Sequence, residues 1–143
     1  MTSPTPLYTT EAIATGAGRS GHVSSRDGFL DTDLKIQKEL GGPGDGLNPE
    51  TLFAAGYAAC YHSALQSVAR EQKAELGDSS VGAQVSIGNI EGGGFGLSVL
   101  LEVVIPEQPH DKAQELADAA HQVCPYSNAT RGNIEVTVTV SDD

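Results

Sequence analysis

The sequence predicts an α+β fold in a single domain, residues 1–143, with elements in the order βββ-α-ββ-α-β. Three observations indicate this class: apolar residues alternate in short runs, two longer segments have helical periodicity, and tight-turn residues separate neighbouring runs. Strands joined by short turns pair antiparallel, so we expect antiparallel sheets and not a doubly wound parallel sheet. A chain of 143 residues is long enough to bury a core without disulfides.

The first third of the chain is predicted to form short strands separated by turns. The strands are expected at residues 8–15, 22–25 and 29–36. A glycine-rich loop at 16–21 separates the first two, and Asp27-Gly28 favours a two-residue hairpin turn between the last two. A second glycine-rich loop, 41–46, follows.

A long central helix is expected after this loop. Asn48 is a good N-cap and Pro49 suits the first helical position, while the periodic pattern continues to about Leu76 with Gly77 as its C-cap. Residues 52–60 carry no charge on any face of the helix, a pattern typical of a buried helix.

The second half of the chain alternates again and contains one more helix. Strands are expected at residues 81–87, 97–105 and 134–140. The glycine run at 91–94 marks a turn between the first two of these strands. A helix is predicted from Asp111 to Val123, and Pro125 is expected to end it.

Composition excludes several classes of partner. With 8 basic and 19 acidic residues the net charge is -11, which disfavours nucleic acids and anionic membrane surfaces. No stretch reaches the roughly 18–20 apolar residues that a membrane span needs, and the N-terminus lacks the basic and apolar regions of a secretory signal. We therefore expect a cytoplasmic protein that binds neither nucleic acid nor membrane.

The two cysteines are the candidate chemical groups. Cys60 lies mid-helix, where a buried and inert thiol is the commoner situation, and Cys124 lies at a helix end beside a proline. A reactive thiol needs a lowered pKa, and a mid-helix cysteine has no helix N-terminus of its own to supply it. Among the 8 cations, Arg19 stands out because it lies in an otherwise uncharged glycine-rich loop.

Other chemistries have weaker support. His62 is two residues from Cys60 and points to another side of the helix, although His22, His110 or His121 could approach through the fold. His121 and Cys124 have a spacing that suits two metal ligands, but no further ligands are spaced to complete a zinc site. No nucleotide or flavin motif is present, so we expect no bound cofactor and no metal.

Two long segments resemble known cysteine motifs. Residues 48–60, NPETLFAAGYAAC, and residues 123–133, VCPYSNATRGN, are similar to the two motifs of the organic hydroperoxide resistance proteins (Ohr) of the Ohr/OsmC superfamily. The N-terminal Tyr8-Thr9-Thr10 and the loop that holds Arg19 also fit, so the resemblance covers nearly the whole chain. The form of the second motif resembles the Ohr branch more than the OsmC branch.

The resemblance implies a fold, an activity and roles for four residues. It implies an intertwined homodimer with central helices enclosed by sheets, and a thiol peroxidase that reduces organic hydroperoxides to alcohols. Cys60 would be the peroxidatic thiol and Cys124 the resolving thiol, with Arg19 and Glu50 activating Cys60. The electron donor would be dihydrolipoamide carried on a lipoylated protein, and not thioredoxin.

This assignment agrees with the inventory of reactive groups. The cycle requires two thiols, one to form a sulfenic acid and one to convert it to a disulfide, together with a guanidinium. The small apolar residues around Cys60 suit a bulky alkyl or fatty-acid hydroperoxide. Two alternatives stay open: a hydrolase with a cysteine nucleophile, and a non-catalytic α+β binding module.

Helix geometry also predicts a site shared between two chains. Glu50 and Cys60 are ten residues apart on one predicted helix, so they lie roughly 15 Å apart along its axis. One arginine joins them within a chain only if every side chain is extended. Two such helices packed antiparallel would bring Glu50 of one chain near Cys60 of the other.

Overall fold

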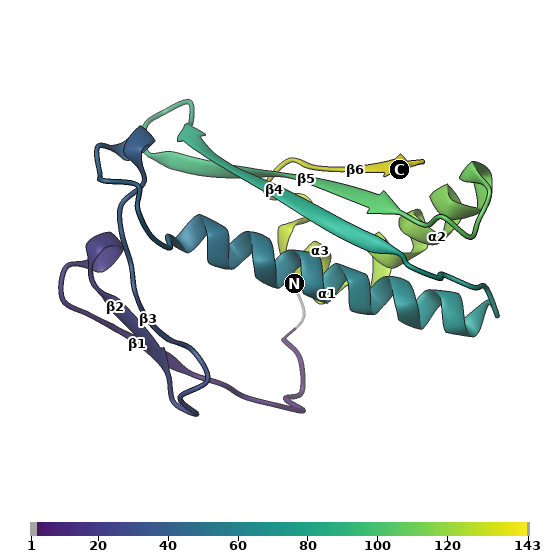
Figure 1. Cartoon of the computed structure of the whole chain (residues 1–143), viewed down its shortest axis with the longest axis horizontal. Helices are drawn as coiled ribbons and strands as arrows, with labels where there is room; N and C mark the ends of the chain where they lie inside the picture. The colour runs from purple at the N-terminus through teal and green to yellow at the C-terminus, as the bar shows by residue number, and fades with distance from the viewer. Residues whose placement is uncertain (1–2, 143) are drawn as a thin grey trace. The chain divides into compact units, whose positions relative to one another are not determined.

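The structure, a computed structural model, describes residues 3–142 of the chain. These residues form two compact units, an N-terminal unit that ends at Pro49 and a C-terminal unit that begins at Glu50. Helices and two separate sheets make up the chain, so the predicted α+β class is confirmed (Figure 1). Each unit is described by itself.

The N-terminal unit contains a small antiparallel sheet in the order β1-β2-β3. Its strands are β1 (Ala12–Thr15), β2 (His22–Ser25) and β3 (Asp31–Asp33). A 3-10 turn, η1 (Gly18–Ser20), lies between β1 and β2, and a second, η2 (Lys38–Leu40), follows β3. Two of the strands are shorter than predicted. The connection from β2 to β3 is also longer than a two-residue turn, because the Asp27 carboxylate accepts hydrogen bonds from the Ser25 hydroxyl and the Phe29 N–H.

The C-terminal unit is built on a second sheet in the order β4-β5-β6. Strands β4 (Ser80–Asn89) and β5 (Phe95–Val104) form the predicted antiparallel hairpin. Gly92, Gly93 and Gly94 in its turn all have positive φ angles, which explains the run of glycines. The alternation is also confirmed, since Val99, Leu101 and Val103 of β5 are buried.

The last strand corrects the expectation of wholly antiparallel sheets. Strand β6 (Val136–Ser141) lies beside β5 and runs parallel to it. The physical reason is the length of the connection: two helices lie between β5 and β6, and such a crossover returns the chain to the end of the sheet from which β5 started.

Helix α1 (Pro49–Glu71) begins where predicted and ends earlier than predicted. The Lys73 N–H donates to Arg70 O and the Ala74 N–H to Ala69 O, a pair of bonds that closes a helix C-terminus. Lys73 itself has φ 56°, the left-handed conformation that such a closure requires. The expected cap at Gly77 is therefore wrong.

Helix α2 (His110–Val123) agrees with the prediction, but Pro125 does not end the helical region. It opens a further short helix, α3 (Pro125–Thr130). A proline lacks an N–H and has a helical φ, so it stops a preceding helix and suits the first position of the next. Cys124 is the residue between them, the C-cap of α2 and the N-cap of α3.

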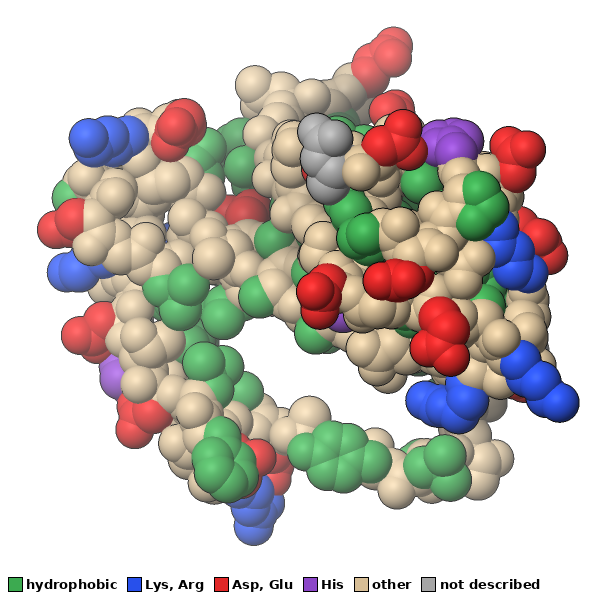
Figure 2. Space-filling model, turned by 45° about the vertical axis from the view of Figure 1, so that its right-hand side comes forward, with side chains coloured by type: hydrophobic (Ala, Val, Ile, Leu, Met, Phe, Trp, Pro, Cys, Tyr) green, Lys and Arg blue, Asp and Glu red, His purple; other side chains and the backbone are tan. Residues whose placement is uncertain are grey.

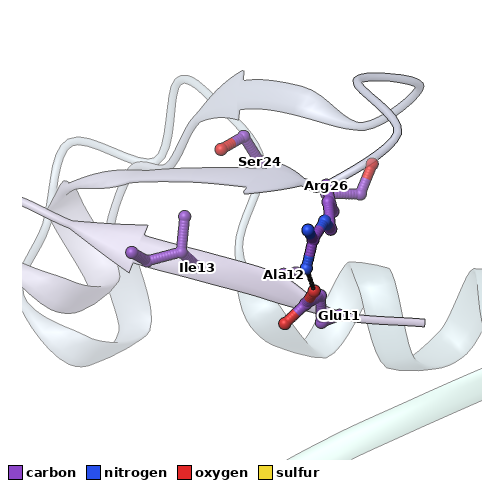
Figure 3. A pocket seen from close by; sticks show the side chains of 6 residues that line it. Glu11, Ala12, Ile13, Ser24 and Arg26 are labelled. Atoms are coloured by element: carbon purple, nitrogen blue, oxygen red, sulfur yellow. Dashed lines mark hydrogen bonds and ion pairs between the residues drawn. The ribbon is translucent and has the colours of Figure 1, made fainter. Parts of the chain in front are cut away.

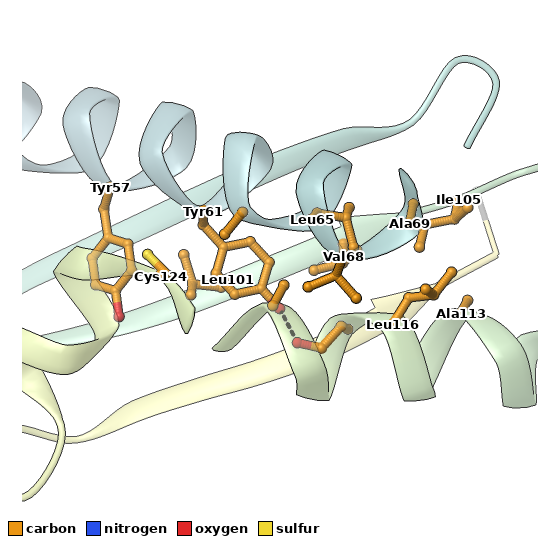
Figure 4. Packing of buried hydrophobic residues seen from close by; sticks show 14 of the residues in the cluster. Tyr57, Tyr61, Leu65, Val68, Ala69, Leu101, Ile105, Ala113, Leu116 and Cys124 are labelled. Atoms are coloured by element: carbon orange, nitrogen blue, oxygen red, sulfur yellow. Dashed lines mark hydrogen bonds between the residues drawn. The ribbon is translucent and has the colours of Figure 1, made fainter. Parts of the chain in front are cut away.

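The core of the C-terminal unit lies between α1, β5 and α2 (Figure 4). Its largest fully buried side chains include Tyr57, Tyr61 and Leu65 of α1, with Leu101 of β5 and Leu116 of α2. The expectation that the charge-free first half of α1 is buried holds only in part. The more fully buried half of the helix is the later one, and Ala55 and Ala59 are exposed.

Candidate active site

The two cysteines lie together in the C-terminal unit. Their Sγ atoms are 3.8 Å apart, although the residues are 64 positions apart in the sequence. Cys60 comes from the middle of α1 and is half-buried, whereas Cys124 lies at the α2–α3 junction and is completely buried. A disulfide needs an S–S distance of about 2 Å, so a small approach would allow the two sulfurs to bond.

The surroundings of Cys60 act on its thiol in opposite directions. Burial raises the pKa of the Cys60 thiol above its ordinary value, a hydrogen bond from the backbone N–H of Tyr126 lowers it in part, and Cys124 raises it further. The raised pKa means that these neighbours alone favour the thiol over the thiolate. A nucleophilic Cys60 therefore requires an additional positive charge.

The hydrogen bond from Tyr126 corrects one step of the sequence reasoning. Cys60 was expected to lack help from a helix N-terminus because it lies mid-helix. In the folded unit, the first turn of α3 lies against α1: the Tyr126 N–H contacts the Cys60 sulfur, and the Ser127 N–H donates to Cys124 Sγ at 3.5 Å. No sequence signal marked this contact, because it depends on an unexpected helix and on its tertiary position.

Three aromatic rings lie beside the cysteines. Phe53 and Tyr57 of α1 and Tyr126 of α3 pack with ring centroids 5.7 to 6.3 Å apart. Phe53 and Tyr126 also line a groove of about 450 Å³, which is mostly apolar. Its other lining residues are Phe95, Gly96, Leu97, Ala129, Thr130, Asn133 and Ile134. Tyr126 thus connects the groove to Cys60.

Gly56 allows the Tyr126 ring to lie close to α1. A Cβ atom at this position would be 3.0 Å from Tyr126 Oη and 3.2 Å from its Cε2. We expect Gly56→Ala to displace the ring and weaken the Tyr126 N–H bond to Cys60, so that the Cys60 pKa rises and peroxide attack slows about two- to threefold. The helix preference of alanine, about 1 kcal/mol, offsets part of the free energy that displacing the ring costs. Thiolate absorbance measured against pH tests this prediction.

Gly82→Ala is the matched control, because a Cβ at Gly82 meets nothing within 4 Å. It should leave the titration of Cys60 unchanged. Identical Cys60 titrations in wild type, Gly56→Ala and Gly82→Ala would show that the Tyr126 ring does not govern the contact.

The histidines are engaged elsewhere. His62 bonds to Ser79 at 3.0 Å, His121 bonds to Ser127 at 2.8 Å, and His22 lies between Asp31 and Asp33. The prediction that His62 points away from Cys60 agrees with its contact. Within residues 3–142, no histidine hydrogen-bonds to a cysteine, which counts against a local Cys–His hydrolase.

Arg19 and Glu50 belong to different units. Arg19 lies in η1 of the N-terminal unit, and Glu50 is in the first turn of α1. Helix α1 runs without interruption through both Glu50 and Cys60, so their separation of roughly 15 Å along the axis applies to the folded chain. The pairing of Arg19 and Glu50 with Cys60 stays a prediction.

The remaining features do not compete with the cysteine site. A pocket of about 310 Å³ on the N-terminal sheet is lined by the Arg26–Glu11 ion pair and by Ile13 and Ser24, without a thiol (Figure 3). In the described part of the chain, no cluster of three potential metal-ligating side chains occurs. Acidic side chains outnumber basic ones on the face that Figure 2 shows, in agreement with the net charge of -11.

Comparison with known proteins identifies the family. The OsmC-like protein family matches residues 42–139. The organic hydroperoxide resistance protein of Xanthomonas axonopodis pv. citri is 53% identical over 144 residues, which cover 99% of this chain and 100% of that protein. This chain is an Ohr protein of the OsmC-like family. OhrB of Bacillus subtilis is 49% identical over 131 residues, covering 91% of this chain and 95% of OhrB.

A solved structure supports the same assignment. The Ohr protein of Elizabethkingia anophelis superimposes with a TM-score of 0.91 at 55% identity, covering 96% of this chain and 99% of that one. The predicted family and the α+β fold of the single chain are therefore confirmed, and an Ohr protein is by its name connected with resistance to organic hydroperoxides. Among residues 3–142, no helix has both the length and the apolar character to cross a membrane.

Proposed function

We propose that this Ohr protein is a thiol peroxidase that reduces organic hydroperoxides to alcohols. The observation that carries the proposal is the 3.8 Å distance between the sulfurs of Cys60 and Cys124, which come from separate helices of one unit. The partial exposure of Cys60 supports its role as the thiol that reacts with the peroxide, and the burial of Cys124 supports its role as the resolving thiol. The names of the relatives support an organic hydroperoxide as the substrate.

The proposed catalytic cycle needs only these two thiols and an external dithiol reductant. The Cys60 thiolate attacks the distal peroxide oxygen, the O–O bond breaks, and the departing alkoxide takes a proton and leaves as the alcohol. The Cys124 sulfur then forms an S–S bond with Cys60 while the S–O bond breaks, and the hydroxyl leaves with the Cys124 proton as water. A dithiol returns two electrons and two protons to the disulfide by thiol exchange.

The apolar groove supports a substrate with an organic tail. Phe53, Leu97 and Ile134 are among its lining residues, as is Tyr126, whose backbone N–H hydrogen-bonds to Cys60. Burial of a hydrocarbon chain contributes about 0.8 kcal/mol for each methylene group. We therefore infer a preference for alkyl and fatty-acid hydroperoxides over hydrogen peroxide.

Steady-state kinetics test the substrate and the electron donor together. We propose that dihydrolipoamide on a lipoylated protein is the electron donor. We also propose that this Ohr protein is cytoplasmic and has no resident cofactor. With dihydrolipoamide, turnover of alkyl and fatty-acid hydroperoxides should exceed turnover of hydrogen peroxide, and thioredoxin should support little turnover. Equal kcat/KM values for all peroxides would contradict the role of the groove, and faster turnover with thioredoxin would contradict the proposed donor.

Cys60 needs a nearby positive charge to form its thiolate, and this need supports a role for Arg19. In the C-terminal unit, Lys112 bonds to Gln72 and Arg131 bonds to Asn128, while Arg70 lies in the last turn of α1 and Lys73 follows the end of that helix. We propose that Arg19 supplies the charge, with Glu50 orienting its guanidinium. A guanidinium is suited to this role because its planar fork can contact a thiolate and a carboxylate together.

We also propose that two chains form a homodimer and share each site. Leu7, Tyr8, Ile13 and Phe29 of the N-terminal unit expose 63% to 102% of their surface in the single chain, and burial of these large apolar side chains against a second chain would remove them from water. Helix α1 also exposes Ala55 and Ala59, small residues that allow close packing. A twofold dimer is the commonest oligomer.

Subunit mixing tests the shared site. Glu50→Ala and Cys60→Ser proteins, each with little activity, are unfolded, mixed and refolded together. If Glu50 serves Cys60 of the partner chain, a mixed dimer has one intact site, and activity should return to about a quarter of wild type, since half of the random dimers are mixed. Heterodimers without activity would show that each site belongs to one chain. Glu50→Ala refolded alone is the control.

A further inference from the structure

A network of buried hydrogen bonds surrounds the side chain of Ser127, three residues after Cys124. Ser127 and Thr130 are the buried polar side chains of the described part of the chain, and Ser127 is completely inaccessible. The Ser127 hydroxyl lies 2.8 Å from the Tyr57 hydroxyl of α1 and 2.8 Å from Nδ1 of His121 of α2. Since Ser127 belongs to α3, one hydroxyl connects all three helices.

When the four hydrogen bonds of this network are all formed together, one assignment of donors satisfies them. Each hydroxyl donates one hydrogen, and Thr130 donates its hydrogen to the Ser127 carbonyl at 3.2 Å. Tyr57 must therefore donate to Thr130 Oγ1, which is 3.1 Å away, and Ser127 must donate to Tyr57. The bond between Ser127 and His121 then requires the hydrogen on Nδ1 of the imidazole.

The network is coupled to both sulfurs through the first turn of α3. The Ser127 N–H donates to Cys124 Sγ at 3.5 Å, and the preceding N–H, that of Tyr126, contacts Cys60. Cys124 lies between two helices, and its position follows from how α3 is held against α1 and α2. Cys60 lies instead within the 23-residue helix α1, which has its own packing against the sheet.

We propose that Ser127, held by the Nδ1–H of His121, is a positioning residue for disulfide formation. This inference rests on the proposed peroxidase function. In that step the Cys124 sulfur approaches the Cys60 sulfenic acid, an S–S bond forms, the S–O bond breaks, and water leaves with the Cys124 proton. The network keeps Cys124 aligned with Cys60 for this displacement, and peroxide attack by Cys60 depends on it much less.

Substitutions of Ser127 and of His121, the two partners of the hydrogen bond, test the positioning role of Ser127. Ser127→Ala removes the hydroxyl, and His121→Leu removes the donor, while His121→Asn keeps an N–H donor at the δ position. Ser79→Ala is the matched control, because Ser79 forms a similar bond with His62 away from the sulfurs. His121 is half-buried, so its variants remain informative if Ser127→Ala fails to fold.

Rapid-quench measurements separate the two steps. Reduced protein is mixed with cumene hydroperoxide, quenched with an alkylating agent, and resolved by mass spectrometry into thiol, sulfenic acid and disulfide. We expect disulfide formation to slow about tenfold in Ser127→Ala and His121→Leu, with loss of the Cys60 thiol changed less than about threefold. Excess peroxide should then overoxidise more of Cys60. His121→Asn and Ser79→Ala should resemble wild type.

The outcomes distinguish this inference from the function on which it rests. Unchanged disulfide formation in Ser127→Ala and His121→Leu, or an equal loss in both steps, would overturn the positioning role. No disulfide in wild type would overturn the proposed function itself. The nitrogen chemical shifts of the His121 ring, measured on the wild-type protein, test the hydrogen-bond assignment independently. We expect a hydrogen on Nδ1 and none on Nε2 near neutral pH. The reverse tautomer would overturn the proposed network.

Discussion

Replacing Cys60 with serine is expected to abolish the reduction of organic hydroperoxides. A serine hydroxyl is not ionised near neutral pH and is a poor nucleophile toward a peroxide oxygen, so the rate should fall to that of the uncatalysed reaction. Serine differs from cysteine by one atom, and Cys60 is only half-buried, so the fold should persist. Stopped-flow consumption of cumene hydroperoxide measures the loss, and circular dichroism confirms folding.

Cys124→Ser supplies the comparison for this prediction. It should reduce one equivalent of hydroperoxide at nearly the wild-type rate and then stop, because the Cys60 sulfenic acid has no resolving thiol. With excess peroxide, Cys60 should progress to the sulfinic acid. If Cys60→Ser instead gives the rapid single turnover and Cys124→Ser does not, the roles of the two thiols are reversed.

Replacing Arg19 with alanine is expected to have the second largest effect. The neighbours of Cys60 together raise the pKa of its thiol, so a cation must offset burial if the thiolate is to form near neutral pH. Loss of Arg19 should raise this pKa further and slow peroxide attack about 10²- to 10³-fold, the usual cost of removing a donor that stabilises developing charge. Thiolate absorbance against pH and single-turnover kinetics measure the two effects.

Two substitutions make the Arg19 result specific. Arg19→Lys should restore part of the rate, because a lysine keeps the charge without the two-sided contact of a guanidinium. Arg26→Ala removes another arginine of the N-terminal unit, one that pairs with Glu11, and should leave the Cys60 titration unchanged. The same Cys60 pKa and rate in wild type and Arg19→Ala would refute the role of Arg19.

The pH dependence follows from the sign of the Cys60 shift. Because the pKa of Cys60 is raised by its neighbours, the thiolate fraction of Arg19→Ala should be small near neutral pH and should grow as the pH rises. The rate deficit of this variant should therefore shrink at alkaline pH.

Local patterns predicted the elements whose neighbours are close in sequence. The alternating residues of β4 and β5, with three glycines between them, specify a hairpin from side-chain period and turn chemistry alone. The early end of α1 was not predictable in this way. Gly77 is the stronger sequence signal for a C-cap, yet the chain closes the helix with Lys73 in a left-handed conformation.

The site was predictable in its chemistry more than in its geometry. The two motifs identified Cys60 and Cys124, and the structure brings them together. The contacts of Tyr126 and Ser127 with the sulfurs were not predictable, because they arise from a helix that begins at the proline expected to end one. The same applies to β6, whose direction depends on how far that helical connection carries the chain.

The thiols of wild-type protein, counted before and after one equivalent of an organic hydroperoxide, test the central proposal most directly. Peptide mass spectrometry of the same samples locates any disulfide. We expect both thiols of each chain to disappear together and a single disulfide to join Cys60 to Cys124 within the chain, as their 3.8 Å separation suggests. If both thiols survive the hydroperoxide, the protein is not a thiol peroxidase and the proposed cycle is wrong.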